Sequence, residues 1–192
     1  MLFYDLAENA LANYERLVAA ADAVGACTKK WRIDAQGRVS DPKYHAGAGH
    51  LVKRSATFFD RHHAFPYLAL NVDAPMARSD SALFVFLPDR LLVKERGVIG
   101  AVSYENLRAS ARDGRFIEEE SVPSDAQVVG RTWRYVNKRG GPDRRFKYNR
   151  QLPVCAYNEL DLESDSGLRA RFSLSRAGAA QALSAWLNSQ RA

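Results

Sequence analysis

The residues best suited to bind a charged partner lie in one segment, 131–150. The segment carries eight positive charges against the single carboxylate of Asp143, a net charge of +7, so the rest of a chain with total charge +6 sums to −1. Guanidinium groups pair with phosphate oxygens, and aromatic rings placed among them stack on bases. We therefore predict an anion- or partner-binding surface made of Arg131, Trp133, Arg134, Lys138, Arg139, Arg144, Arg145, Lys147 and Arg150.

A purely structural role explains the same segment. In an extended strand, Trp133 and Tyr135 would face one side while Arg134 faces water on the other. The arginines could also pair with the acidic run 118–120, a few residues earlier in the chain. Runs of like charge are commonly solvated surface, so the sequence leaves both interpretations open.

The other reactive side chains form no recognisable catalytic or metal-binding pattern. The run 118–120 is expected to be a solvated loop, because consecutive glutamates point in different directions and do not converge on one cation. The four histidines, of which His62 and His63 are adjacent, have no paired cysteines of the kind that zinc sites use. Neither a Walker-type phosphate loop nor a glycine-flanked nucleophilic serine occurs. We predict a protein that is not an enzyme, with no catalytic residue, no metal and no cofactor.

The cysteines and the first residues bear on the compartment. Cys27 and Cys155 are the only two cysteines, whereas small secreted domains with a disulfide framework use more. Cys155 lies in an apolar stretch, where burial would raise the pKa of its thiol. Residues 1–8 carry acids where a signal peptide carries Lys or Arg, and no apolar run approaches the ~20 residues that span a bilayer. We expect a cytoplasmic protein with two buried thiols.

The elements that position these residues begin with a helix. Apolar residues recur at three- and four-residue steps from Leu6 to Val24, and Gly25 is a suitable C-terminal stop. Residues 28–49 contain several turn residues and are expected to be a connector with room for one short strand. We divide the chain into an N-terminal helix with its connector, 1–49, and a β-domain, 50–192.

From residue 50 onward, short apolar runs bounded by turn residues predict strands. The clearest unit is a hairpin in which Pro88 and Asp89 connect 83–87 with 90–94, because proline presets its φ and aspartate bonds nearby backbone. A second turn leads into 98–104 and completes a meander. The other expected strands are 51–59, 67–72, 107–112, 128–137, 154–163 and 168–174.

The chain is expected to end in a helix over 176–190 that begins at Ser175 as its N-cap. The apolar residues of this segment share one face, which would cover the open end of the sheet. That face is made of Ala179, Ala180, Leu183, Trp186 and Leu187.

This order of elements resembles bacterial pleckstrin-homology-like domains, which are bent antiparallel sheets capped by one C-terminal helix. The resemblance rests on the Pro-Asp-Arg turn at 88–90 within the meander and on the segment 102–107 that follows it. FVFLPDR at 84–90, GRTWRYVNK at 130–138 and GPDRRF at 141–146 resemble a module of uncharacterised bacterial proteins. The resemblance implies a mainly antiparallel sheet or barrel of about seven or more strands with a capping helix, which together with the N-terminal helix predicted from spacing gives an α+β fold.

Pleckstrin-homology-like folds bind lipids, peptides and proteins, so the fold alone does not identify a ligand. The first hypothesis is association with a protein partner or with a second copy of the chain. The second is binding of nucleic acid, and the third binding of anionic membrane lipid, each through 131–150. All three are binding roles without catalysis, and the fourth alternative is an enzyme of a type that the sequence does not identify.

Overall fold

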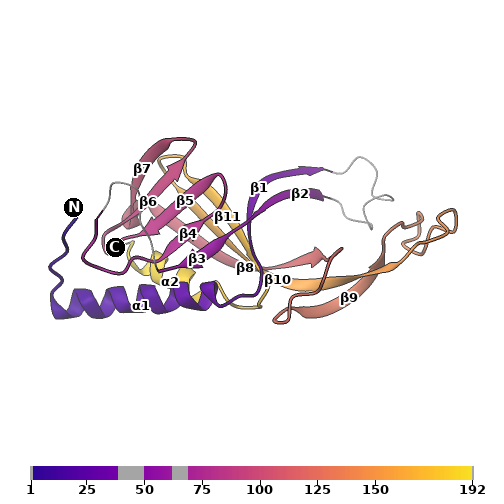
Figure 1. The fold of residues 1–192 in the computed structure, drawn as a ribbon, viewed down its shortest axis with the longest axis horizontal. Helices are drawn as coiled ribbons and strands as arrows, with labels where there is room; N and C mark the ends of the chain where they lie inside the picture. Colours follow the sequence, from indigo (N-terminus) through magenta and orange to yellow (C-terminus); the bar gives the residue numbers. More distant parts are fainter. Residues whose placement is uncertain (1, 39–49, 62–68, 192) are drawn as a thin grey trace.

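The computed structural model describes residues 2–38, 50–61 and 69–191. The chain has an α+β fold with two antiparallel sheets, an N-terminal helix and a C-terminal helix (Figure 1). The described strands form no closed barrel. The five-stranded sheet has the order β3 (Phe58–Asp60), β4 (Met76–Arg78), β5 (Ala82–Phe86), β6 (Arg90–Glu95) and β7 (Val98–Ser103). The six-stranded sheet has the order β2 (His50–Ala56), β1 (Lys30–Arg38), β11 (Arg169–Leu174), β10 (Gln151–Ser164) and β8 (Leu107–Ile117), with β9 (Gln127–Trp133) as a further partner of β10.

The meander predicted for the middle of the chain is confirmed as β5, β6 and β7. The Leu87 N–H donates to the Arg90 carbonyl at 2.9 Å, which closes the proline–aspartate turn between β5 and β6. Between β6 and β7 the turn has two central residues, Arg96 with φ 51° and Gly97 with φ 81°. Two positive φ angles define the tight hairpin turn that matches the twist of antiparallel strands, and glycine adopts one of them without steric cost.

The long strand β10 connects two parts of the molecule. Along one edge it pairs with β8 from Val154 to Ser164. Along the other edge it pairs first with β9, up to Ala156, and then with β11 from Asn158 onward. Residues 127–156, hereafter the arm, therefore extend away from the body that contains the helices (Figure 1).

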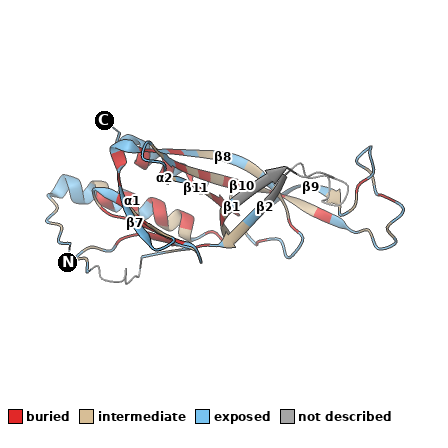
Figure 2. Ribbon diagram, turned by 90° about the horizontal axis from the view of Figure 1, so that it is seen from above, coloured by how far each residue is buried: buried red, intermediate tan, exposed pale blue. Residues whose placement is uncertain are grey.

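The larger of two clusters of buried hydrophobic residues holds the body together. The helices α1 (Glu8–Gly25) and α2 (Gln181–Ser189) contribute buried side chains to the same cluster as both sheets. Phe172 on β11 illustrates the contact, because its ring meets Phe59 at 5.5 Å and Phe84 at 5.3 Å, both edge to face. Figure 2 shows buried residues gathered between helices and sheets, while exposed and half-buried residues predominate in the arm. Across the described ranges no helix combines the length and the hydropathy needed to cross a bilayer.

The terminal helices agree with the predictions in most of their buried faces, although Ala10, predicted on the apolar face of the first helix, is exposed, and they differ at one end. α1 ends at Gly25 as predicted. α2 begins at Gln181, later than predicted, because Gly178 takes a φ of 73° and the chain turns there. Ser175 is not its N-cap: the Ser175 hydroxyl accepts a hydrogen bond from the Lys29 N–H at 2.9 Å and donates to Asp125 at 2.7 Å. The apolar face predicted for α2 is buried.

Several strands differ from the predicted ones. β1 lies in the range expected to be a connector, and it pairs with both β11 and β2. β4 is not among the predicted strands, because its three residues are too few to show an alternation of apolar and polar side chains. Of the predicted strand 67–72, residues 67 and 68 lie outside the described residues, and in 69–72 only an isolated bridge joins Leu70 to Leu2. The predicted strand 128–137 ends early, because the chain turns after Trp133.

Candidate functional site

The basic loop, residues 134–150, lies at the end of the arm and is closed by its own backbone. The last pair of the β9–β10 ladder is Trp133 with Gln151. Beyond it the Arg134 N–H donates to the Arg150 carbonyl at 2.9 Å, and an isolated bridge joins Val136 to Pro142. The loop is therefore a structured extension of the hairpin.

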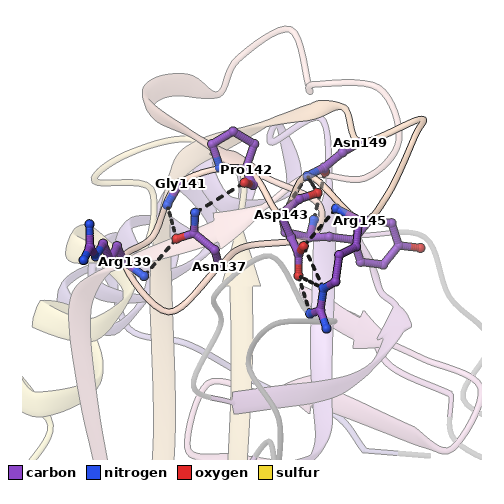
Figure 3. A network of polar contacts seen from close by, with 8 residues as sticks. Asn137, Arg139, Gly141, Pro142, Asp143, Arg145 and Asn149 are labelled. Atoms are coloured by element: carbon purple, nitrogen blue, oxygen red, sulfur yellow. Dashed lines mark hydrogen bonds and ion pairs between the residues drawn. The ribbon is translucent and has the colours of Figure 1, made fainter.

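Asn137 organises the tip of this loop (Figure 3). Its side-chain oxygen accepts hydrogen bonds from the N–H groups of Arg139 at 2.8 Å and Gly141 at 3.1 Å. Its side-chain nitrogen donates to the Pro142 carbonyl at 3.3 Å. Gly140 supplies the positive φ, 81°, that the tight turn requires. Asparagine is favoured in such turns because its short amide bonds backbone two or more residues away.

Asp143 and Asn149 fix the other half of the loop. The Asp143 carboxylate, which is buried, accepts from the Arg145 N–H at 3.1 Å and from its guanidinium at 2.5 Å (Figure 3). Asn149 exchanges two hydrogen bonds with the backbone of Tyr135, at 3.0 and 2.7 Å. The rings of Tyr135 and Phe146 stack with centroids 4.0 Å apart and planes 13° from parallel. These contacts give the loop a small interior of its own.

All nine residues predicted for the binding surface lie on β9 or on this loop, but they differ in burial and in the partners they bind. Arg145 is committed to Asp143, and an Arg150 guanidinium nitrogen donates to the Glu119 carbonyl at 2.9 Å. Trp133 is half-buried at the end of β9. The other six are exposed, and within the described part of the chain none of them forms a salt bridge: Arg131, Arg134, Lys138, Arg139, Arg144 and Lys147. We call these six the arm cations.

The acidic run 118–120 does not neutralise the arm cations, and the prediction of a solvated loop is wrong for Glu118. Glu118 is fully buried, and its carboxylate accepts a 2.5 Å hydrogen bond from the Tyr157 hydroxyl. The same carboxylate lies 3.6 Å from the Lys29 ammonium and 3.9 Å from the Arg54 guanidinium. Its charge is therefore matched by cations from β2 and from the residue before β1, and the loop keeps its own positive charge.

Arg54 and its neighbours make a packed junction at the base of the arm. The Arg54 guanidinium lies between two aromatic rings, 4.1 Å from the centroid of Trp31 and 4.0 Å from that of Phe116. Burial and the hydrogen bond to Glu118 raise the pKa of Tyr157, so its hydroxyl stays protonated and acts as the donor. Charge and cation–π contact together tie β2 to β8 and β10.

The remaining candidate groups contribute no further site in the described residues. Cys27 and Cys155 are free and buried as predicted, and burial raises the pKa of both thiols. His62 and His63 lie outside the described residues. Among the side chains that the structure describes, no cluster of three or more histidine, cysteine, aspartate or glutamate residues is arranged to hold a metal ion.

Comparison of the chain with protein-family models, with curated proteins and with solved structures finds no match. The site is therefore interpreted from its own geometry. Sequence reasoning identified the cations and missed the polar residues that hold the loop in shape, Asn137, Asp143 and Asn149. The signal was present, since asparagine and aspartate beside Gly140, Gly141 and Pro142 are typical of a side-chain-braced turn.

Proposed function

We propose that this protein is a non-catalytic binding module that holds a nucleic acid on the basic loop of its arm. The observation that carries the proposal is the set of six arm cations, exposed and without salt bridges among the described residues, on the end of β9 and a loop closed by internal hydrogen bonds. An anionic chain binds such cations without first breaking ion pairs within the protein. A loop that is already ordered also loses little conformational entropy on binding.

The chemistry of the arm cations favours nucleic acid over the other anionic partners. Four of the six are arginines, whose planar guanidinium groups match phosphate oxygens two at a time. One of the six lies on β9 and five on the two halves of the loop, a spread that suits a chain of repeated phosphates better than a single lipid headgroup. Aromatic side chains of the loop lie among them, as in surfaces that combine phosphate pairing with base stacking.

We propose further that the body has a pleckstrin-homology-like arrangement. The support is the order of its elements: the meander β5 to β7, then the short helix η2 (Tyr104–Asn106), then β8, β10 and β11, then α2. The apolar face of α2 packs where the two sheets meet, with Trp186 against Tyr104 at 5.2 Å. On this account the arm is an elongated hairpin between strands of the domain, and it carries the ligand-binding surface.

The proposal is tested by fluorescence anisotropy with labelled DNA, single-stranded and duplex, at about 50 mM salt and above. The arm variant carries Arg134→Glu, Lys138→Glu and Arg144→Glu. Arg145 is left unchanged because it pairs with Asp143 inside the loop. A matched control makes the same change of charge at two arginines and one lysine of the body that are exposed and form no salt bridge among the described residues: Arg16, Lys53 and Arg78.

We expect the arm variant to bind at least about tenfold more weakly than wild type and the control variant to lose much less. Since log K falls by about 0.7 per phosphate neutralised on a single strand, losing three contacts should reduce the salt slope by about 2. Equal losses in the two variants, or no binding by wild type at low salt, would overturn the proposal. Tighter arm-dependent binding to an acidic peptide or to anionic vesicles would assign the loop to another ligand class.

A further inference from the structure

Tyr148, in the basic loop, has the most exposed ring among the large apolar side chains of the described residues. Its exposure is 88 %, whereas Phe3, the most exposed phenylalanine, reaches 69 %. The contact found at the Tyr148 ring is with its neighbour Lys147, whose ammonium nitrogen lies 6.0 Å from the ring centroid. Apart from this contact with Lys147 over one face, Tyr148 is thus largely open to solvent in the described structure.

The other aromatic rings of the arm are already engaged. Tyr135 and Phe146 stack on each other inside the loop, and Trp133 is half-buried at the end of β9. The loop therefore has an aromatic interior that shapes it, and one further ring, Tyr148, that lies outside this interior. A ring that does not pack against its own chain is available to a ligand.

The backbone that carries Tyr148 is held on both sides. On the C-terminal side, Asn149 makes two hydrogen bonds to Tyr135, and the Arg150 carbonyl accepts from the Arg134 N–H. On the N-terminal side, the Phe146 N–H donates to the Asp143 carbonyl at 3.2 Å. The ring is thus presented from an ordered segment, and ordering a tyrosine side chain on binding restricts only two side-chain torsions.

Cations lie beside this ring on the chain. Lys147 directly precedes it, and Arg144 lies four residues before it on the same half of the loop. A nucleotide places a flat base and a phosphate within one repeating unit, so a ring next to cations can take the base while the cations take the neighbouring phosphates. A base offers its face only when it is unpaired and unstacked, whereas duplex bases cover each other's faces.

From this arrangement we infer that the ligand of the arm is a single-stranded nucleic acid, with a base stacked on Tyr148. The inference rests on the proposed function and specifies its substrate class. Stacking tolerates any base, because every base has a π face, so the arm should bind single strands with little sequence preference. Base–aromatic stacking corresponds to about 5- to 150-fold in affinity per base.

The test compares wild type with Tyr148→Ala and Tyr148→Phe on a labelled single strand and on its duplex. Tyr148→Phe keeps the ring and is the matched control for loss of the hydroxyl. We expect Tyr148→Ala to weaken single-strand binding by about 5- to 150-fold, Tyr148→Phe to bind like wild type, and duplex binding to be the same in all three proteins. A 2-aminopurine base in the strand should be quenched by wild type and not by Tyr148→Ala.

The outcomes separate this inference from the proposed function. If the variant that reverses Arg134, Lys138 and Arg144 loses binding while Tyr148→Ala matches wild type on the single strand, the arm binds nucleic acid and the stacking inference is wrong. Tighter binding of wild type to duplex than to single strand also overturns the inference. If neither variant differs from wild type, both proposals fail. Because the Tyr148 side chain is 88 % exposed, circular dichroism of Tyr148→Ala should match wild type.

Discussion

Replacing Glu118 by alanine should destabilise the fold strongly, because this fully buried carboxylate has a strong donor and two cations around it. The Tyr157 hydroxyl donates to it at 2.5 Å, and the cationic groups of Lys29 and Arg54 lie within 4 Å. Removing one member of a buried ion pair costs about 3–5 kcal/mol, since the remaining charge stays desolvated without its partner. We expect the lower end, about 3 kcal/mol, because the Lys29 and Arg54 side chains each retain 19 % exposure.

Urea unfolding with linear extrapolation measures this cost. Glu118→Gln also leaves Lys29 and Arg54 without their carboxylate but keeps the volume and an acceptor for Tyr157, a hydrogen bond of about 1 kcal/mol, so it should cost less, about 2 kcal/mol. Glu120→Ala is the matched control, because the Glu120 side chain is 75 % exposed and lies 4.0 Å from the same lysine; its cost should stay below about 0.5 kcal/mol. A free energy of unfolding for Glu118→Ala within about 1 kcal/mol of wild type, or equal to that of Glu120→Ala, refutes this reasoning.

Three further predictions concern stability and reactivity. Arg96→Asn should raise the free energy of unfolding by about 0.5–1 kcal/mol in urea, because asparagine tolerates the positive φ better than arginine. Burial raises the pKa of Asp125, but hydrogen bonds, including that from Ser175, outweigh it and lower the pKa overall. The lowered pKa of Asp125 stabilises the folded protein above about pH 4, and this stabilisation is lost as pH falls through the folded-state pKa. The free energy of unfolding of Asp125→Asn in urea should therefore depend less on pH in that range than that of wild type. The buried thiols of Cys27 and Cys155 should react with Ellman's reagent far faster in urea than in the native protein.

The parts of the fold that the sequence predicts well depend on neighbours in the chain. The hairpin around Pro88 and Asp89 follows from turn chemistry and two flanking apolar runs. The buried face of α2 follows from the spacing of Leu183, Trp186 and Leu187. Both patterns lie within a dozen residues and need no information about distant partners.

The parts that the sequence does not predict depend on partners far along the chain. Glu118 belongs to an acidic run that is typical of solvated surface, and only the fold brings Lys29 and Arg54 to its carboxylate. Ser175 has the residue type of an N-cap, yet its hydroxyl donates to Asp125 and accepts from the N–H of Lys29, the residue before β1. Residue type states what a side chain can bond, and tertiary contacts decide which bond it makes.

For the candidate site, the sequence predicts the charge and the structure assigns the roles. Clustering of arginine and lysine in 131–150 identifies the segment without any alignment. It does not separate Arg145, which holds the loop in shape through Asp143, from Arg134 or Arg144, which have no salt bridge among the described residues. That difference decides which substitutions test binding and which would disturb the loop itself.

The claim that the arm holds a nucleic acid is tested most directly by locating the contact. A single strand carrying 4-thiothymidine is bound at low salt, irradiated and digested, and the crosslinked peptides are identified by mass spectrometry. We predict that the crosslinks map to 131–150, with Tyr148 among the modified residues, and that they disappear at high salt as phosphate contacts are lost. Crosslinks that map to the helices or to the five-stranded sheet, and persist when Arg134, Lys138 and Arg144 are reversed in charge, would contradict it.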